Sequence, residues 1–202
     1  LFPTLRRAIN FYIPFLEEDE QGILHLKETY SPEYGSAKDC NYDIALLRWG
    51  CQTLLKASQI LSIKDDLIPK WQEIIEKLTD YPQDENGMMI GKDVPFSKSH
   101  RHYSHLLMFY PLYLLNIEQN ESKELLEKSV EHWLSIPGNI LGFSNTGASS
   151  LYAAAGEGDK ALEKLKGLFA LTLRPNTMYM ESGPVIETPL SGAQCIHDML
   201  LQ

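Results

Sequence analysis

The chain has 202 residues, enough to bury a sizeable core, and its 44% hydrophobic and 22% charged residues are ordinary for a globular protein. Its 18 Lys and Arg residues stand against 27 Asp and Glu residues, which gives a formal net charge of -9. Nucleic acids and anionic membranes bind clustered positive charge, so we expect neither as a partner. No apolar run approaches the ~18 residues that a membrane helix needs, and the first residues show no signal-peptide pattern, so we expect no membrane insertion.

Helical periodicity dominates the chain from its first residues. In the segment TLRRAINFYIPFL, residues such as Leu5, Ile9 and Leu16 recur at three- and four-residue steps and therefore share one face of a helix. The only clear strand signal lies in residues 23–26. The same helical pattern predicts further helices, in chain order, over about 42–62, 66–79, 103–116, 121–135, 145–155, 158–171 and 190–202.

Such a succession of helices with short connections predicts an all-α fold built from antiparallel helix hairpins. The pattern does not choose between an open superhelical solenoid and a closed toroid. Because the chain starts at Leu1 without a Met and opens almost directly into an amphipathic pattern, we expect it to be a piece of a longer protein. Trp49, Trp71 and Trp133 lie on helical faces and are expected in the core.

The cysteines argue against a disulfide-stabilised fold, and the longer loops favour a carbohydrate-binding site. Three cysteines in helical stretches form no disulfide framework, so we expect buried free thiols at Cys40, Cys51 and Cys195. The non-helical segments set aromatic residues beside carboxylates, a combination that sugar clefts use, although they could simply cover helix ends. These segments are 27–41, 81–102, 136–144 and 173–189.

Four motifs, in this order, resemble those of family 95 glycoside hydrolases of the α-L-fucosidase type. They span nearly the whole chain, and their agreement in order and spacing carries more weight than any one motif. The motifs are YSPE at 30–33 with NYD at 41–43, HRHYSHL at 100–106 with YP at 110–111, GFSNT at 142–146 with LYA at 151–153, and VIET at 185–188 leading into MLLQ at 199–202.

The resemblance implies that residues 1–202 are the C-terminal portion of a single (α/α)6 toroidal catalytic domain. It implies inverting hydrolysis of terminal α-L-fucosyl or related α-L-galactosyl linkages, with a fucosylated or related glycan as the partner and a secreted or periplasmic location. A partial toroid would expose apolar helix faces. We therefore expect either a missing N-terminal part of the same domain or self-association through those faces.

By position in the motifs, the resemblance implies that Glu33 is the general acid and that Glu187 is the partner of the catalytic water. Inverting hydrolysis needs one carboxyl group to protonate the leaving oxygen and another, ~6.5–9.5 Å away, to activate water. Tyr30 and Tyr34 could shield Glu33 from water and so favour its protonated form.

The resemblance further assigns substrate binding to Arg101 and His102, and we add His100 and Tyr34 to that set. A zinc site is the alternative for the histidines, since His102 and His105 are three residues apart. No carboxylate or Cys follows them at metal-ligand spacing in the sequence, so we expect no metal and no cofactor, and we expect His105 to be a packing residue.

Several positions depart from the family pattern or allow another interpretation. Asp43 is a natural N-cap for the helix that follows the YSPE loop. Glu187 stands where the family has Asp, and its extra methylene could misplace the carboxylate. Gly91-Lys92 and Gly147-Ala148 replace Glu-Trp and Trp-Lys, and the family's paired Asn residues have no counterpart here.

These departures keep two alternatives to catalysis open. One is a catalytically inactive relative that only binds carbohydrate. The other is a helical-repeat binding module of the tetratricopeptide type, suggested by LYAAAGEGDKALEKLKGLF at 151–169. A true repeat array should show that pattern again about 34 residues away, and residues 117–135 supply only a vague echo.

Overall fold

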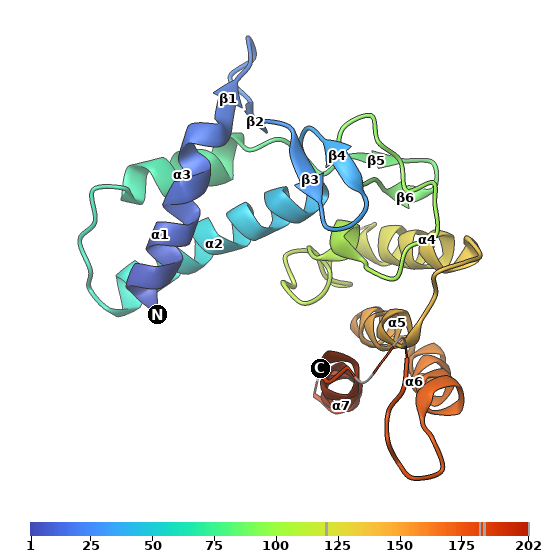
Figure 1. The fold of residues 1–202 in the computed structure, drawn as a ribbon. Helices are drawn as coiled ribbons and strands as arrows, with labels where there is room; N and C mark the ends of the chain where they lie inside the picture. Colours follow the sequence, from blue (N-terminus) through green and yellow to red (C-terminus); the bar gives the residue numbers. More distant parts are fainter. Residues whose placement is uncertain (120, 182, 184, 202) are drawn as a thin grey trace. The chain divides into compact units, whose positions relative to one another are not determined.

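The computed structural model describes residues 1–119, 121–181, 183 and 185–201 of the chain. The chain divides into two compact units (Figure 1). The first unit comprises Leu1–Asp84 and Met88–Pro95, and the second comprises Glu85–Gly87 and the chain from Phe96 onward. Helices dominate both units, as the sequence predicts.

The described part of the first unit contains three helices, with α2 at its centre. These are α1 (Phe2–Tyr12), α2 (Asn41–Ile60) and α3 (Ile68–Lys77), and both α1 and α3 contact α2. The apolar face of α2 supplies Ile44, Leu47, Cys51 and Leu54 to a core in which each side chain is fully buried, together with Trp71 and Ile74 of α3. The core thus follows the helical period read from the sequence.

A glycine in α2 sets how closely α1 can approach. A Cβ atom added at Gly50 would lie 2.1 Å from Cδ1 of Ile9, which is itself buried in this core. Only the absence of a side chain at position 50 therefore allows the α1 and α2 backbones their observed separation.

Short strands accompany the helices. The antiparallel pair β1 (Leu16–Glu18) and β2 (Leu24–Leu26) follows α1 and a 3-10 turn, η1 (Ile13–Phe15). A second antiparallel pair follows at once, and a third two-stranded sheet comes after α3. Strand β2 confirms the strand signal at 23–26, whereas the others are too short for a recognisable alternation. They are β3 (Thr29–Ser31) with β4 (Gly35–Ala37), and β5 (Gln83–Asp84) with β6 (Gly87–Met88).

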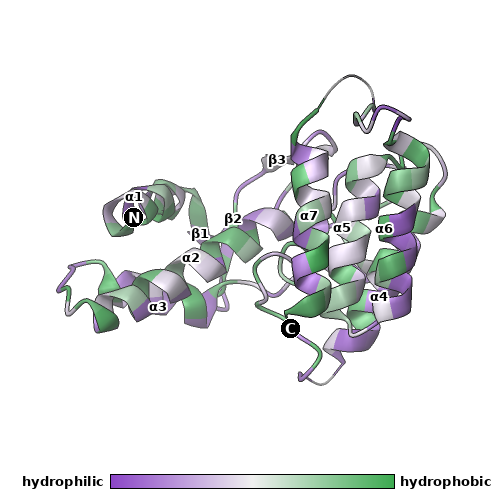
Figure 2. Ribbon diagram, turned by 90° about the horizontal axis from the view of Figure 1, so that it is seen from below, coloured by the Kyte–Doolittle hydropathy of each residue, from purple (hydrophilic) through white to green (hydrophobic). Residues whose placement is uncertain are grey.

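The second unit is built around α5. Its elements are η2 (Ser104–Leu106), α4 (Ser122–Ser135), α5 (Gly142–Ala154), α6 (Gly158–Thr172) and α7 (Glu187–Leu200). Helix α5 packs against both α6 and α7, and these three helices stand side by side (Figure 2). Helix α5 also touches α4. Small side chains on α5 permit this close packing, because Ala148, Ser149 and Ser150 are almost completely buried.

One predicted helix is wrong. Residues 103–116 form only the 3-10 turn η2 followed by further turns. The apolar period of this segment is helical, but Pro111 has no N–H to donate and its ring clashes with the carbonyl four residues earlier. The backbone instead closes short turns, such as the hydrogen bond from Phe109 N–H to the Leu106 carbonyl, 3.0 Å long.

Other sequence expectations meet mixed outcomes. Trp71 and Trp133 are fully buried, as predicted, whereas Trp49 is only half-buried. The three cysteines are buried and free, which confirms that prediction. The last predicted helix starts three residues earlier than expected, as α7, and its final residue, Gln202, lies outside the described residues. Among the helices of the described chain, none is both long and apolar enough to span a membrane.

We predict that Gly50→Val destabilises the first unit by about 1–3 kcal/mol, because the added side chain collides with buried Ile9 and overpacks the core. Urea unfolding followed by tryptophan fluorescence, to which buried Trp71 of this unit contributes, measures the loss. Gly35→Val is the matched control, since a Cβ at position 35 meets no atom within 4 Å. Equal stability of the two variants would contradict the packing argument.

Candidate active site

Glu33 lies in the turn that joins β3 to β4. Its side chain is exposed, and its backbone has φ 57°, a left-handed conformation that is uncommon for residues other than glycine. The turn is closed by a hydrogen bond from the Tyr34 N–H to the Ser31 carbonyl, 3.0 Å long. The hairpin therefore holds the Glu33 backbone in a sparsely populated conformation, which is a common property of functional sites.

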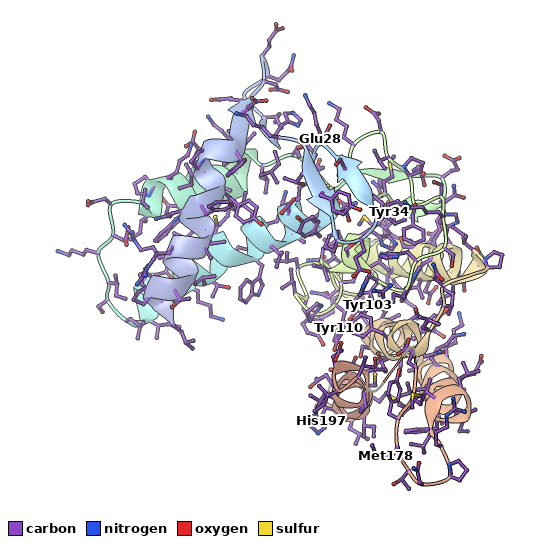
Figure 3. All side chains as sticks on the ribbon, viewed as in Figure 1. Glu28, Tyr34, Tyr103, Tyr110, Met178 and His197 are labelled. Carbon is purple, nitrogen blue, oxygen red and sulfur yellow. The ribbon has the colours of Figure 1, made fainter. Side chains whose placement is uncertain are left out.

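Tyr34, which follows Glu33 in the hairpin, is 6% exposed, and its hydroxyl donates to the Pro95 carbonyl at 3.4 Å. Figure 3 shows its side chain beside the β3–β4 hairpin. Only a small part of the side chain is left to touch a sugar, so the predicted substrate contact of Tyr34 stays a prediction.

Two side chains of α2, Asp43 and Tyr42, hold the base of the same hairpin. Asp43 is fully buried, and its Oδ2 accepts a hydrogen bond of 2.6 Å from the Thr29 hydroxyl at the start of β3. The Tyr42 hydroxyl donates to the Tyr30 carbonyl at 3.4 Å. Burial raises the pKa of Asp43, although the hydrogen bond from Thr29 opposes the shift.

This placement corrects the expected role of Asp43. The N-cap position of α2 is occupied by Cys40, and Asp43 lies inside the first turn of the helix. A buried carboxylate that accepts a hydrogen bond from a strand is a tertiary contact rather than a cap. Asp43 therefore ties the hairpin that carries Glu33 to the core of the first unit.

The segment with Arg101 and His102 lies in the second unit, where buried groups hold its backbone. The indole N–H of fully buried Trp133 donates to the His100 carbonyl at 2.8 Å, and the Ser144 hydroxyl donates to the Arg101 carbonyl at 3.1 Å. Helices α4 and α5 thus fix two consecutive residues of this segment. Arg101 and His102 remain half-buried, as groups that bind a ligand must.

The imidazoles of this segment have two environments. His100 and His102 lie with ring centroids 5.0 Å apart, and His102 packs edge-on against Phe143 at 5.5 Å. Two imidazoles at this separation can hold sugar hydroxyls or supply two ligands to a metal ion. His105, in contrast, is buried and stacked on Phe96 at 4.4 Å, and burial lowers its pKa to about 3, so it is a neutral packing residue.

Glu187 is the first residue of α7. Its side chain is exposed, and its Oε2 accepts the Ile186 N–H at 3.1 Å. A carboxylate is favoured at this position, because the first turn of a helix carries a partial positive charge. Glu187 is thus available to solvent, with its carboxylate drawn back toward the start of its own helix.

Sequence reasoning missed Glu181. Its Oε1 accepts the Gly142 N–H at 3.0 Å, and its Oε2 accepts the hydroxyls of Tyr179 and, at 3.4 Å, Thr188. Burial, reinforced by the Glu181 carboxylate, raises the pKa of Tyr179 to about 12. The sequence signal for Glu181 is that it lies in the long loop 173–189 between two predicted helices, two residues after Tyr179.

Two departures from the family pattern have a packing explanation. A Cβ at Gly91 would lie 2.7 Å from the Ala37 Cβ in β4, and one at Gly147 would lie 2.1 Å from the ring of Tyr103. Tyr103 is nearly buried beside Tyr110, with ring centroids 6.3 Å apart (Figure 3). Neither glycine can be replaced by a large residue without moving its neighbour.

The predicted site residues divide between the two units. Glu33 and Tyr34 belong to the first, and His100, Arg101, His102 and Glu187 belong to the second. Within the second unit, the first turn of α5 contacts both the segment with Arg101 and the start of α7. The Ser144 hydroxyl donates to the Arg101 carbonyl. Glu181 accepts hydrogen bonds from both the Gly142 N–H and the hydroxyl of Thr188, the neighbour of Glu187.

We predict that Asp43→Asn gains stability over the wild type as the pH rises. The folded-state pKa of Asp43 is raised, so its stabilising contribution is present below the unfolded value of 3.8 and is lost as the pH rises through the folded value. Urea unfolding at pH 4 and pH 7 measures the difference. Asp66→Asn, at an exposed carboxylate, is the control, and a parallel response of both variants would contradict the burial of a titrating Asp43.

Comparison with models of known protein families gives a match over almost the whole chain. The family model described as the glycosyl hydrolase family 95 catalytic domain matches residues 1–200. No curated protein matches the chain.

Proposed function

Because the chain belongs to the glycosyl hydrolase family 95 catalytic domains, we propose that it hydrolyses terminal α-L-fucosyl or related α-L-galactosyl linkages with inversion. The match confirms the resemblance carried by the four motifs. The chain is therefore a glycosidase domain, and carbohydrate is its substrate class. We propose further that its helix hairpins form the C-terminal portion of one (α/α)6 toroid spanning residues 1–202.

In the proposed reaction, the carboxyl group of Glu33 donates its proton to the glycosidic oxygen as the bond to the anomeric carbon breaks. The carboxylate of Glu187 takes a proton from the water that attacks the opposite face of that carbon. Arg101, His100 and His102 donate hydrogen bonds to sugar hydroxyls, and Tyr34 supports the turn that carries Glu33.

One observation above all supports this assignment within the second unit. Arg101 and the residue after Glu187 are both attached to the first turn of α5, through Ser144 and through Glu181. Substrate-binding groups and a water-activating carboxylate must be held at a fixed separation to act on one sugar. The buried packing of α5 provides such a fixed point.

Of the two alternative functions, the family match argues against the helical-repeat module, whereas the inactive carbohydrate-binding relative still has to be tested. Residues 151–169 belong to α5 and α6, and the family match includes them in the catalytic domain, so they need no separate tetratricopeptide-like function. A carbohydrate-binding relative without catalysis is favoured by the extra methylene of Glu187 where the family has Asp. An assay for glycoside hydrolysis distinguishes this alternative from an active enzyme, because only the enzyme turns over its substrate.

We predict that Glu33→Gln lowers kcat about 100-fold or more, as expected for the loss of a general acid. The full-length protein is assayed on a natural glycan, on aryl α-L-fucosides and on the corresponding α-L-galactosides. The loss should be smaller for nitrophenyl substrates, because a good leaving group needs less protonation. The product that forms first should be the β-anomer by proton NMR, as inversion requires.

Glu28→Gln is the matched control, since Glu28 is an exposed carboxylate just before β3 in the same unit (Figure 3). It should leave kcat unchanged. Equal kcat for wild type and Glu33→Gln would rule out Glu33 as the acid. Glycan binding by calorimetry without turnover by the wild type would establish the inactive relative instead.

Exposed apolar side chains support the proposal that further structure covers the second unit. Leu171 of α6 and Leu200 of α7 are 66% and 74% exposed, and an apolar groove of about 560 Å³ lies between α6, α7 and the loop that contains Met178. Solvent-exposed apolar faces of this kind favour association.

We expect the 202-residue chain expressed by itself to elute from gel filtration as a species larger than 23.0 kDa. Ile196→Lys, in the lining of the groove, should shift it toward the monomer, because a charged side chain disfavours burial of that face. A well-behaved 23.0 kDa monomer would show that the apolar face needs no covering.

A further inference from the structure

Glu181 lies between the starts of two helices. Its Oε1 accepts the N–H of Gly142, the first residue of α5, and its Oε2 accepts the hydroxyl of Thr188, the second residue of α7. Tyr179 donates a third hydrogen bond to the same carboxylate. The N-terminal ends of both helices carry partial positive charge, so one carboxylate here stabilises both.

The local backbone is shaped around this carboxylate. A Cβ at position 142 would lie 2.4 Å from the Tyr179 hydroxyl and 3.2 Å from Oε2 of Glu181. Any side chain at Gly142 would therefore push Tyr179 and Glu181 away from α5. Thr188 is 1% exposed, so its hydroxyl has no access to bulk water and depends on a protein partner.

The same turn of α5 also holds the predicted substrate-binding segment. Ser144, two residues after Gly142, donates to the Arg101 carbonyl at 3.1 Å, and Phe143 packs against the His102 ring. Through Glu181, this turn is joined to Thr188, and Glu187 is the residue before it. A continuous set of contacts therefore runs from Arg101 to Glu187 through Glu181.

We propose that Glu181 is a positioning residue, which holds Glu187 in place relative to Arg101 and His102 by joining the N termini of α5 and α7. The proposal rests on the hydrolytic function proposed above. Both oxygens of Glu181 already accept hydrogen bonds from the protein, so we leave the water-activating role with Glu187 and assign Glu181 a positioning role. Its role is to keep a carboxylate on a neighbouring helix within reach of the sugar, where a displacement of about 1 Å is costly.

The kinetic test compares variants of the full-length protein. We expect Glu181→Ala to lower kcat about tenfold or more, with KM changed by less than about twofold, because Glu187 is displaced while the sugar still binds. Glu181→Gln should lose less, since its amide oxygen can still accept the Gly142 N–H. A catalytic carboxylate would instead lose as much in the Gln variant as in the Ala variant, and that result would overturn the positioning role.

A double-variant comparison shows whether Glu181 acts through Glu187. In the Glu187→Gln background, Glu181→Ala should cause no further loss of kcat, because the group that it positions is already disabled. Additive losses would overturn the inference. Glu163→Gln on α6 is the control, since this side chain is 76% exposed, and it should leave kcat unchanged.

Hydrogen exchange provides a readout that does not depend on activity. Glu181→Ala should speed exchange in peptides covering 141–146 and 186–192, because both helix starts lose a hydrogen-bond acceptor. Thr188→Val, which removes one hydroxyl and keeps the volume, should speed the second peptide and lower kcat to a smaller extent. It serves as the second variant if Glu181→Ala fails to fold.

The failures of the two proposals are distinguishable. Unchanged exchange in both peptides overturns the link between α5 and α7, whatever the activity. Hydrolysis by the wild type with no loss in the Glu181 variants overturns the positioning role alone. If the wild type hydrolyses no α-L-fucoside or α-L-galactoside, the proposed function fails, and the catalytic role of Glu181 fails with it.

Discussion

The second unit depends on the burial of α5 between its neighbours. Two large helices can approach both sides of α5 only because Ala148, Ser149 and Ser150 are small. The two serine hydroxyls are satisfied inside this packing, by the Ala161 carbonyl at 2.9 Å and by Asp198 at 2.6 Å. A helix held in this way cannot shift or rotate without leaving buried polar groups unpaired.

Because α5 is rigidly packed, its first turn can hold two irregular segments in fixed positions. Its Ser144 side chain and Gly142 N–H reach groups on two other segments, the one that contains Arg101 and the loop that ends at Glu187. Neither segment is regular secondary structure, so neither could fix its own side chains. Residues on irregular segments become precise when a buried helix holds their backbone.

In the first unit, the hairpin with Glu33 is likewise held in place by buried groups of the core. Its strands are three residues long and could not be stable alone. Contacts from buried Asp43 to Thr29 and from Tyr34 to Pro95 hold it against the core, and this support balances the cost of about 1–3 kcal/mol for the left-handed backbone of Glu33. A candidate acid is thus presented from a small but well-supported turn.

Several features were readable from the sequence because their signals are local. The apolar period of α2 predicts its buried face, and the small and apolar residues at 145–155 predict most of α5. The four motifs identify the family on which the catalytic assignment of Glu33 and Glu187 rests. The same local reading failed for residues 103–116, where the period is helical but Pro111 interrupts the backbone hydrogen bonds.

Other features were decided only by tertiary structure, because they join residues far apart in the chain. Asp43 looks like an N-cap until Thr29, 14 residues earlier, is seen to donate to it. From the sequence, Gly91 is only a loss of the side chain that the family carries there. The structure shows that β4 leaves no room for a side chain at this position. Glu181 has no motif, and its role emerges only when Gly142, 39 residues away, lies against it. The sequence by itself determined the family, most helices and the candidate chemistry, since these follow from residue type and period. The fold decided which groups hold that chemistry in place, since hydrogen bonds and close packing depend on distance in space.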